Sequence, residues 1–233
     1  MDLNKILVCI TNHNDNDNAK KLKKDFSEYI DTIIIDSGSK EEIDEFDIKL
    51  DNIYYTGLYN ESVNQCIVRN KEYLYFIASD VFIDETSDII EIIRNLDDNI
   101  YLWGPSSKGQ SHQHCKNRNT NNYRKVAYLE GFTFLVNIDV CKKFYPVDRN
   151  SNFYGYGIDI LIGYYTINYF KKLGVVDDRV EVYHREGSGY NQNTALREMY
   201  NWFSNMNKDI FEYIVYYSKG SNSEQLIKFL ENK

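Results

Sequence analysis

The sequence predicts an α/β protein whose central sheet is mostly parallel and flanked by helices. Two observations carry this prediction. Short apolar runs alternate with segments of helical periodicity through the first 104 residues, which is the order of elements in parallel sheets. The runs are also apolar at nearly every position, and this continuous pattern is typical of strands buried on both faces.

The first half of the chain contains five predicted strands and three predicted helices. The run "KILVCI" is short and ends in the polar segment "TNHNDND", as a buried strand that enters a loop would. Leu22 and Phe26 recur at helical spacing after it, with Asp17 or Asn18 as a candidate cap. The predicted strands span residues 5–10, 31–40, 52–57, 73–80 and 99–104, and the predicted helices 19–29, 60–70 and 87–96.

The second half of the chain has a different pattern. Residues 104–125 are polar and nearly free of apolar side chains, so we expect a long loop of the kind that is often functional. We expect the C-terminal part of the chain to form an aromatic-rich helix and a short last helix. The remaining predictions are a strand over 126–137, a helix over 138–144, a glycine-rich turn and helix over 153–174, one or two strands ending at His184, and helices over 194–217 and 221–232.

Polar side chains follow four of these elements. Parallel sheets bind ligands beyond the carboxyl ends of their strands, so these polar groups are expected at one edge of the sheet. They lie in residues 11–14, 36–39, 57–60 and 79–80. The sequence therefore predicts a ligand site at this edge.

Asp80 stands where the buried run "YLYFIASDV" is about to end. A hard divalent cation commonly takes one or two carboxylates, and phosphates complete its ligand shell. His184, which follows the strand pattern "VEVY", is a candidate partner because imidazole suits manganese more than magnesium. The alternatives are that Asp80 is a turn residue and that His184 is structural.

The segment "NFYGYGIDI" offers a second candidate carboxylate. Gly155 and Gly157 permit tight backbone geometry, and Asp159 then falls in the first turn of a helix. Asp159 either complements the helix dipole there or acts as a general base beside a glycine-lined pocket. The residues alone leave both readings open.

Composition and charge exclude several classes of function. The net charge of −8 argues against nucleic acid as a partner, because phosphate binding needs a clustered basic surface. The four cysteines are scattered, which predicts reduced thiols and a cytoplasmic protein without a zinc site. No run approaches 18 apolar residues, so we expect no transmembrane span. The aromatic residues of 194–217 leave peripheral membrane contact and a homodimer open as alternatives to core packing.

The order of these segments resembles the GT-A glycosyltransferases, especially family-2-like enzymes, over about residues 5–190. "ILVCITNHN" is similar to the first strand and nucleotide loop of that family, and "IIIDSGSK" to its second strand and turn. "YFIASDV" takes the place of the Asp-x-Asp motif, "FYGYGIDI" resembles the segment with the Glu-Asp pair, and "VYHREGSG" resembles the segment with a later metal-binding His. "GLYNESVNQCIVRN" and "YLEGFTFLVN" resemble the intervening helix and the acceptor-side strand.

The resemblance implies a GT-A (Rossmann-like) domain over residues 1–190, with a nucleotide-binding half over 1–104 and an acceptor half over 126–190. Residues 191–233 would form a helical extension packed on the same domain. The implied activity is that of a hexosyltransferase-type enzyme. It would move a sugar, with inversion, from a nucleotide-diphosphate-sugar donor to a hydroxyl of a glycan, glycolipid or protein acceptor.

The resemblance also implies a role for each candidate residue. Asp159 would be the catalytic base, and Asp80 and His184 would hold Mn2+ or Mg2+. Asp36 would contact the nucleotide base, with Thr11 and His13 lining the nucleotide pocket and Ser79 beside the donor.

Two positions depart from the family pattern. Ala78 replaces the first Asp of Asp-x-Asp, and Ile158 replaces the Glu of the Glu-Asp pair, so strict metal dependence is left open. A degenerate GT-A domain that binds carbohydrate or a protein complex is therefore one alternative. A sugar nucleotidyltransferase is another, although "TNHNDNDN" lacks the glycine and the Lys or Arg of the loop those enzymes use.

Overall fold

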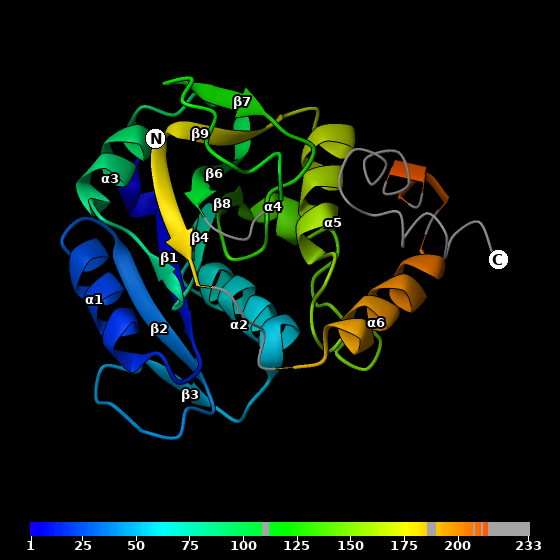
Figure 1. The fold of residues 1–233 in the computed structure, drawn as a ribbon, viewed down its shortest axis with the longest axis horizontal. Helices are drawn as coiled ribbons and strands as arrows, with labels where there is room; N and C mark the ends of the chain where they lie inside the picture. The colour runs from blue at the N-terminus through cyan, green and yellow to red at the C-terminus, as the bar shows by residue number, and fades with distance from the viewer. Residues whose placement is uncertain (109–111, 186–189, 207, 211, 214–233) are drawn as a thin grey trace.

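The computed structural model describes residues 1–108, 112–185, 190–206, 208–210 and 212–213. Its centre is a nine-stranded sheet in the order β3-β2-β1-β4-β8-β6-β9-β5, with β7 paired to β9 (Figure 1). The strands are β1 (Ile6–Asn12), β2 (Asp31–Ser37), β3 (Ile48–Leu50), β4 (Tyr73–Ala78), β5 (Val81–Phe82), β6 (Ile100–Lys108), β7 (Tyr123–Lys125), β8 (Thr133–Asn137) and β9 (Leu173–His184). The helices are α1 (Asn16–Ser27), α2 (Tyr54–Val68), α3 (Thr86–Arg94), α4 (Ile138–Cys141), α5 (Ile158–Tyr164) and α6 (Gln192–Ser204), and short η segments cover Leu3–Lys5 and Tyr165–Tyr169.

The N-terminal half of the sheet is parallel, as predicted. Strand β1 pairs in parallel with β2 and β4, and β2 pairs in parallel with β3. All seven residues of β1 are buried. Ile6, Val8 and Ile10 face one hydrophobic cluster, while Leu7 and Cys9 face another, so the continuous apolar pattern does reflect burial on both faces.

The C-terminal half adds antiparallel strands without reversing the overall direction. Strand β8 is antiparallel to β4, and β6 is antiparallel to β8, so β6 points the same way as β4. Strand β9 is parallel to β6, whereas the short strands β5 and β7 are antiparallel to β9. The prediction of a mostly parallel sheet is therefore confirmed.

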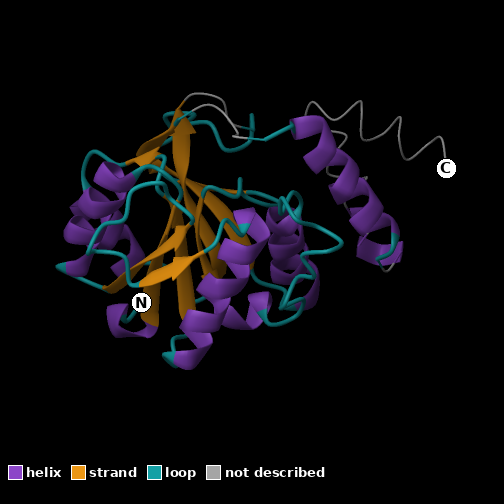
Figure 2. Cartoon of the chain, turned by 90° about the horizontal axis from the view of Figure 1, so that it is seen from below, coloured by secondary structure: helices purple, strands orange, loops and turns teal. Residues whose placement is uncertain are grey.

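Helices cover both faces of this sheet (Figure 2). Leu22 and Phe26 of α1 pack in the same cluster as the isoleucines of α3. The apolar sides of α2, α4 and α5 pack in the cluster on the other face. Helix α6 lies outside α5, and Phe203 of α6 packs against Leu161 of α5 in a third cluster.

Several predicted elements are wrong in type or extent. Residues 54–57 begin helix α2 instead of forming a strand, because Tyr55, Leu58 and Tyr59 meet the core at helical spacing and this packing overrides the β preference of aromatic residues. The polar group at 57–60 therefore lies inside a helix and not at the sheet edge. Asn60 holds Val147 there, with its Nδ2 donating to the Val147 carbonyl oxygen at 2.8 Å.

Other boundaries shift for local reasons. Residues 104–108 extend β6, and 123–125 form β7, so the predicted loop is shorter than expected. Only residues 133–137 of the predicted strand 126–137 are extended in the sheet. Helix α1 begins at Asn16, ahead of both candidate caps. The predicted last helix and the end of the predicted helix over 194–217 lie outside the described residues. None of the described helices is long and apolar enough to cross a membrane.

Candidate functional site

The turn that carries Asp80 is fixed by contacts from two neighbouring elements. Strand β4 ends at Ala78, and the backbone N–H of Ser79 donates to the carbonyl oxygen of Thr11 in β1 at 2.8 Å. Asn18 of α1 donates from its Nδ2 to the carbonyl oxygens of Ser79 and Val81, at 2.6 and 2.8 Å. These bonds hold the turn on both sides of Asp80.

Asp80 and His184 face one another across the short ladder between β5 and β9. Val81 is paired with His184 in that ladder, and His184 Nε2 lies 3.4 Å from Asp80 Oδ2. The imidazole stacks on the Phe132 ring, with centroids 4.4 Å apart, so its orientation is held. The other carboxylate oxygen, Asp80 Oδ1, is buried and has no hydrogen-bond partner.

This pair fits a divalent cation. A buried polar atom without a partner is rare in folded proteins and calls for an explanation such as an ion. A carboxylate oxygen beside an imidazole nitrogen is a donor set that manganese accepts. In the described part of the chain, no cluster of three or more His, Cys, Asp or Glu side chains could hold a metal. A cation here would therefore need further ligands from a substrate.

Arg185 was missed by the sequence reasoning, although it directly follows His184. Its backbone N–H donates to the carbonyl oxygen of Asp80 at 3.0 Å. Its guanidinium donates from Nη2 to the carboxylate of Asp15 and lies 5.1 Å from the centre of the Phe82 ring. A guanidinium next to the Asp80–His184 pair adds positive charge that suits an anionic ligand.

The position of Asp159 is set by two glycines in a backbone conformation that other residues rarely adopt. Gly155 and Gly157 have φ values of 76° and 87°, in the left-handed region. A Cβ on Gly157 would lie 2.2 Å from the Phe203 ring, and one on Gly155 would lie 2.3 Å from the Tyr55 ring. The turn therefore packs tightly on α2 and α6 and sets the start of α5, which carries Asp159.

The surroundings of Asp159 raise the pKa of its carboxyl group to about 6. Burial is the main cause, and the nearby charge of Glu130 acts in the same direction. The charge of His112 and the N–H of Ile160, which donates to Asp159 Oδ1 at 2.8 Å, act against it. A carboxylate with a pKa close to neutrality suits general-base catalysis.

Residues 131–132 contact both His184 and Tyr55. Phe132 stacks on His184, and the carbonyl oxygen of the adjacent Gly131 accepts from the Tyr55 hydroxyl at 2.6 Å. Burial and, after it, the charge of Asp159 raise the pKa of Tyr55 well above its ordinary value. Residues 131–132 thus connect His184 to Tyr55, and the charge of Asp159 acts on that tyrosine.

The predicted nucleotide side lies at the ends of β1 and β2. Asp36 is only 4% exposed, and its carboxylate accepts from Asn12 Nδ2 at 2.9 Å and from the Ser39 N–H at 3.0 Å. Thr11 is also buried, with its hydroxyl directed to the carbonyl oxygen of Ile77. The carboxylate of Asp36 thus binds its own turn, and its contact with a nucleotide base stays a prediction.

His13 is the exposed member of this group, and its Nδ1 lies 2.7 Å from the carbonyl oxygen of Ser37. An open cavity of about 330 Å³ adjoins the same loops, lined by Asn14, Asn16, Lys40 and Glu41. All four of these side chains are polar or charged.

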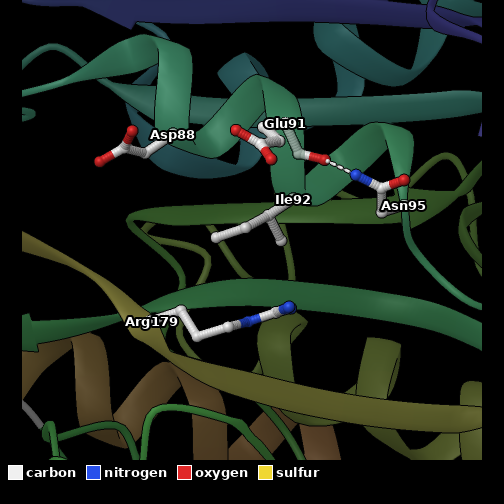
Figure 3. A pocket seen from close by; sticks show the side chains of 5 residues that line it. All are labelled: Asp88, Glu91, Ile92, Asn95 and Arg179. Carbon is white, nitrogen blue, oxygen red and sulfur yellow. Dashed lines mark hydrogen bonds between the residues drawn. The ribbon is translucent and has the colours of Figure 1, made fainter.

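A second hollow, of about 250 Å³, lies elsewhere (Figure 3). Asp88 and Glu91 of α3 line one side of it, and Arg179 of β9 lies on the other. Arg179 is bound to Asp177, with its Nη2 donating to the carboxylate at 2.6 Å. None of the residues predicted for the site lines this hollow.

Comparisons with known proteins find relatives by structure only. No protein-family model matches the chain, and no curated protein sequence matches it. It resembles S. aureus TarS 1–349 in complex with UDP-GlcNAc, with a TM-score of 0.61 and 14% identity over 94% of this chain and 74% of that one. It also resembles glucosyl-3-phosphoglycerate synthase from Mycobacterium tuberculosis in complex with Mn2+, UDP and glucosyl-3-phosphoglycerate, with a TM-score of 0.54 and 12% identity over 85% and 78%.

A third similar structure is GalNAc-T7 with UDP, GalNAc and Mn2+, with a TM-score of 0.56 and 10% identity over 79% of this chain. The match spans 43% of the length of GalNAc-T7, which is less than half of that protein. At such identities the likeness concerns the fold. What the chain shares with these structures is a central sheet flanked by helices.

Proposed function

We propose that this chain, which has the GT-A fold, is a glycosyltransferase that uses a nucleotide-diphosphate-sugar donor. The observation that carries the proposal is the unpartnered, buried Asp80 Oδ1 beside the imidazole of His184 at the end of β4. The three similar proteins were crystallised with UDP or UDP-GlcNAc, and two of them with Mn2+. This supports the same class of donor here.

Donor binding is assigned to the edge of the sheet. Asp80 and His184 would hold Mn2+ or Mg2+, and a bound ion supplies Lewis-acid neutralisation of the charge that grows on the leaving diphosphate. Arg185 adds a second positive charge once its guanidinium exchanges Asp15 for a phosphate oxygen. We assign Thr11, His13, Asp36 and Ser79 to the nucleotide of the donor, because they lie at or just beyond the ends of β1, β2 and β4.

Transfer is assigned to Asp159. Its carboxylate takes the proton of the acceptor hydroxyl, and the hydroxyl oxygen forms a bond to the anomeric carbon. The bond from that carbon to the diphosphate breaks, and its electron pair leaves with the nucleoside diphosphate. Attack from the face opposite the leaving group inverts the configuration, through a transition state of oxocarbenium character.

The two departures from the family pattern have different consequences for the site: one concerns metal affinity and the other the number of carboxylates beside the base. Ala78 leaves Asp80 as the sole carboxylate of the motif, so we expect modest metal affinity. Ile158 is fully buried in a core cluster and takes no part in chemistry. The charge of Glu130, which comes from a different segment, contributes to the raised pKa of Asp159.

A thermal-shift screen tests the proposal. We expect one sugar nucleotide among UDP-, GDP- and dTDP-sugars to raise the Tm when Mn2+ is present, because a ligand of the folded state stabilises it by mass action. Asp80→Ala should abolish the part of the shift that depends on Mn2+. Asp88→Ala, at an exposed carboxylate on α3, is the matched control and should keep it.

Two results would contradict the proposal. In the first, no sugar nucleotide raises the Tm. In the second, the Tm shift of Asp88→Ala, like that of Asp80→Ala, is the same with and without Mn2+. Release of nucleoside diphosphate then separates an enzyme from a domain that only binds carbohydrate. An enzyme releases it in the presence of Mn2+, by transfer or by slow hydrolysis, and a binding domain leaves the donor intact.

A further inference from the structure

Four aromatic residues beside the candidate site belong to none of the hydrophobic core clusters of the described residues. They are Tyr54, Phe153, Tyr154 and Tyr190. Each is partly exposed. Aromatic side chains of this size are normally placed where they bury their area in a core. We call this group the aromatic platform.

The rings of the aromatic platform contact one another. Tyr154 and Tyr190 stack, with centroids 4.7 Å apart and an interplanar angle of 28°. The centroid of the Tyr54 ring lies 4.5 Å from that of Phe153 and 5.3 Å from that of Tyr154. Three separate segments thus bring their rings together: the start of α2, the turn before α5 and the segment that leads into α6.

Tyr54 is held in a strained backbone conformation. Its φ is 52°, in the left-handed region that bulky residues avoid. The side chain of Asn52 accepts from the Tyr54 N–H at 3.2 Å and helps to fix this conformation. Such strain persists where the surrounding structure requires it, and it is concentrated at functional sites.

The aromatic platform adjoins the part of the candidate site that carries Asp159. Phe153 and Tyr154 belong to the glycine-rich turn that leads into Asp159. Burial, then Tyr156 and more weakly the charge of Asp80, raise the pKa of Tyr190. Tyr55, next to Tyr54, is within the electrostatic reach of both Asp159 and Tyr190. A ligand lying on these rings would thus be close to the base.

We propose that the aromatic platform binds a pyranose ring of a carbohydrate acceptor, an assignment that rests on the proposed function of the site. A pyranose has an apolar C–H face and a polar rim, and aromatic rings with hydroxyl groups at their edges complement both. A ring on the platform can direct a hydroxyl to Asp159, whereas the charged groups of the donor are assigned to Asp80, His184 and Arg185.

A guanidinium at the platform is already engaged by one of its rings, which favours a neutral acceptor. The Arg149 guanidinium lies 5.3 Å from the centre of the Phe153 ring, over its face, so it is engaged with the platform itself. A small anionic acceptor would need cations directed into the site. Arg185 is assigned to the donor.

The test measures sugar binding without any donor. Ligand-observed NMR titrations would use the methyl β-glycosides of glucose, galactose, mannose and N-acetylglucosamine. We expect at least one to bind, and Tyr154→Ala to weaken it about tenfold, since one aromatic face is lost. Tyr154→Phe keeps the ring and should bind like the wild type. Tyr169→Ala removes an exposed tyrosine outside the platform and should also leave binding unchanged.

The same four proteins are titrated with UDP and Mn2+ to separate donor from acceptor, after circular dichroism has shown that each is folded. The proposal expects unchanged UDP affinity in Tyr154→Ala. It is overturned if no glycoside binds the wild type, if Tyr154→Ala binds glycosides as well as the wild type, or if UDP affinity falls in parallel. Failure of every sugar nucleotide to bind would sink the proposed function, while the glycoside titration would still decide the role of the platform.

Discussion

At the scale of single residues, the account depends on the carboxyl group of Asp159. Burial raises its pKa from an ordinary value of 3.8 to about 6. Between these values the unfolded chain has lost the proton that the folded chain keeps. Folding stability therefore falls as pH rises through this window, and above it the full cost of the charged carboxylate is present. Such a cost is expected where function requires a basic carboxylate.

The first prediction concerns Asp159→Asn. The variant cannot accept the proton, so we expect transfer to fall about 10²- to 10⁴-fold with donor binding unchanged. Removing this half-buried charge should raise the free energy of unfolding at pH 7.5 by on the order of 1 kcal/mol, because solvent screens part of its cost, and by much less at pH 4. Urea unfolding at the two pH values measures this, with Asp88→Asn as a control. Unchanged turnover would remove Asp159 from the mechanism.

The second prediction is the pH profile of the wild-type enzyme. Asp159 must be ionised to act, so kcat/KM should decline below pH about 6, tenfold per unit of pH at the acid end. The profile is measured with saturating Mn2+ and a donor found by the screen. A rate that stays flat from pH 7 to pH 5 would contradict the assignment.

At the scale of elements, the turn before α5 positions the base. Gly157 stands at the N-cap of α5 with a left-handed φ, and the Phe203 ring of α6 fills the space where a Cβ would project. The turn, α5 and α6 are therefore packed as one unit. The aromatic platform uses the same turn, so its backbone serves both the base and the proposed acceptor subsite.

The third prediction is that Gly157→Ala destabilises the fold by about 1–3 kcal/mol, from left-handed strain and from the clash with Phe203. Urea unfolding gives the value. Gly174→Ala is the control, because Gly174 has no left-handed φ and its nearest atoms lie 3.1 Å or more from an added Cβ. Adding Phe203→Leu should recover only the part due to the clash. Equal costs at Gly157 and Gly174 would contradict this reading.

The sequence predicted most strands because each buried strand is apolar throughout, as in β1 and β4. It failed where polar residues are buried. Ser106 and Ser107 belong to β6 and are buried, and the Ser106 hydroxyl donates to the Val180 carbonyl oxygen at 2.9 Å. The sequence does not show that a distant strand accepts the hydrogen bond of such a serine, so a polar segment of this kind is predicted as a loop. The start of α2 was missed because the helix face of Tyr54–Tyr55 is defined only by its tertiary neighbours.

At the scale of the whole molecule, the sheet order joins chain segments that are far apart. Strand β5 pairs with β9, which brings Asp80 to His184, and β8 follows β4, which brings residues 131–132 to the same edge. The order of motifs predicted that Asp80 and His184 lie together, and the structure places them 3.4 Å apart, whereas the role of Asp159 stays a prediction. Arg185, Glu130 and the aromatic platform come from segments without a periodic pattern, and only the folded chain shows their contacts.

The most direct measurement is the effect of Mn2+ with UDP on the backbone NMR spectrum. A paramagnetic ion broadens the signals of nearby residues and leaves distant ones sharp. We predict broadening at residues 79–81 and 184–185 first, with weaker effects toward Asp159, and none of it in Asp80→Ala. Broadening centred on Asp88 and Glu91, or spread evenly over the acidic surface, would contradict the account.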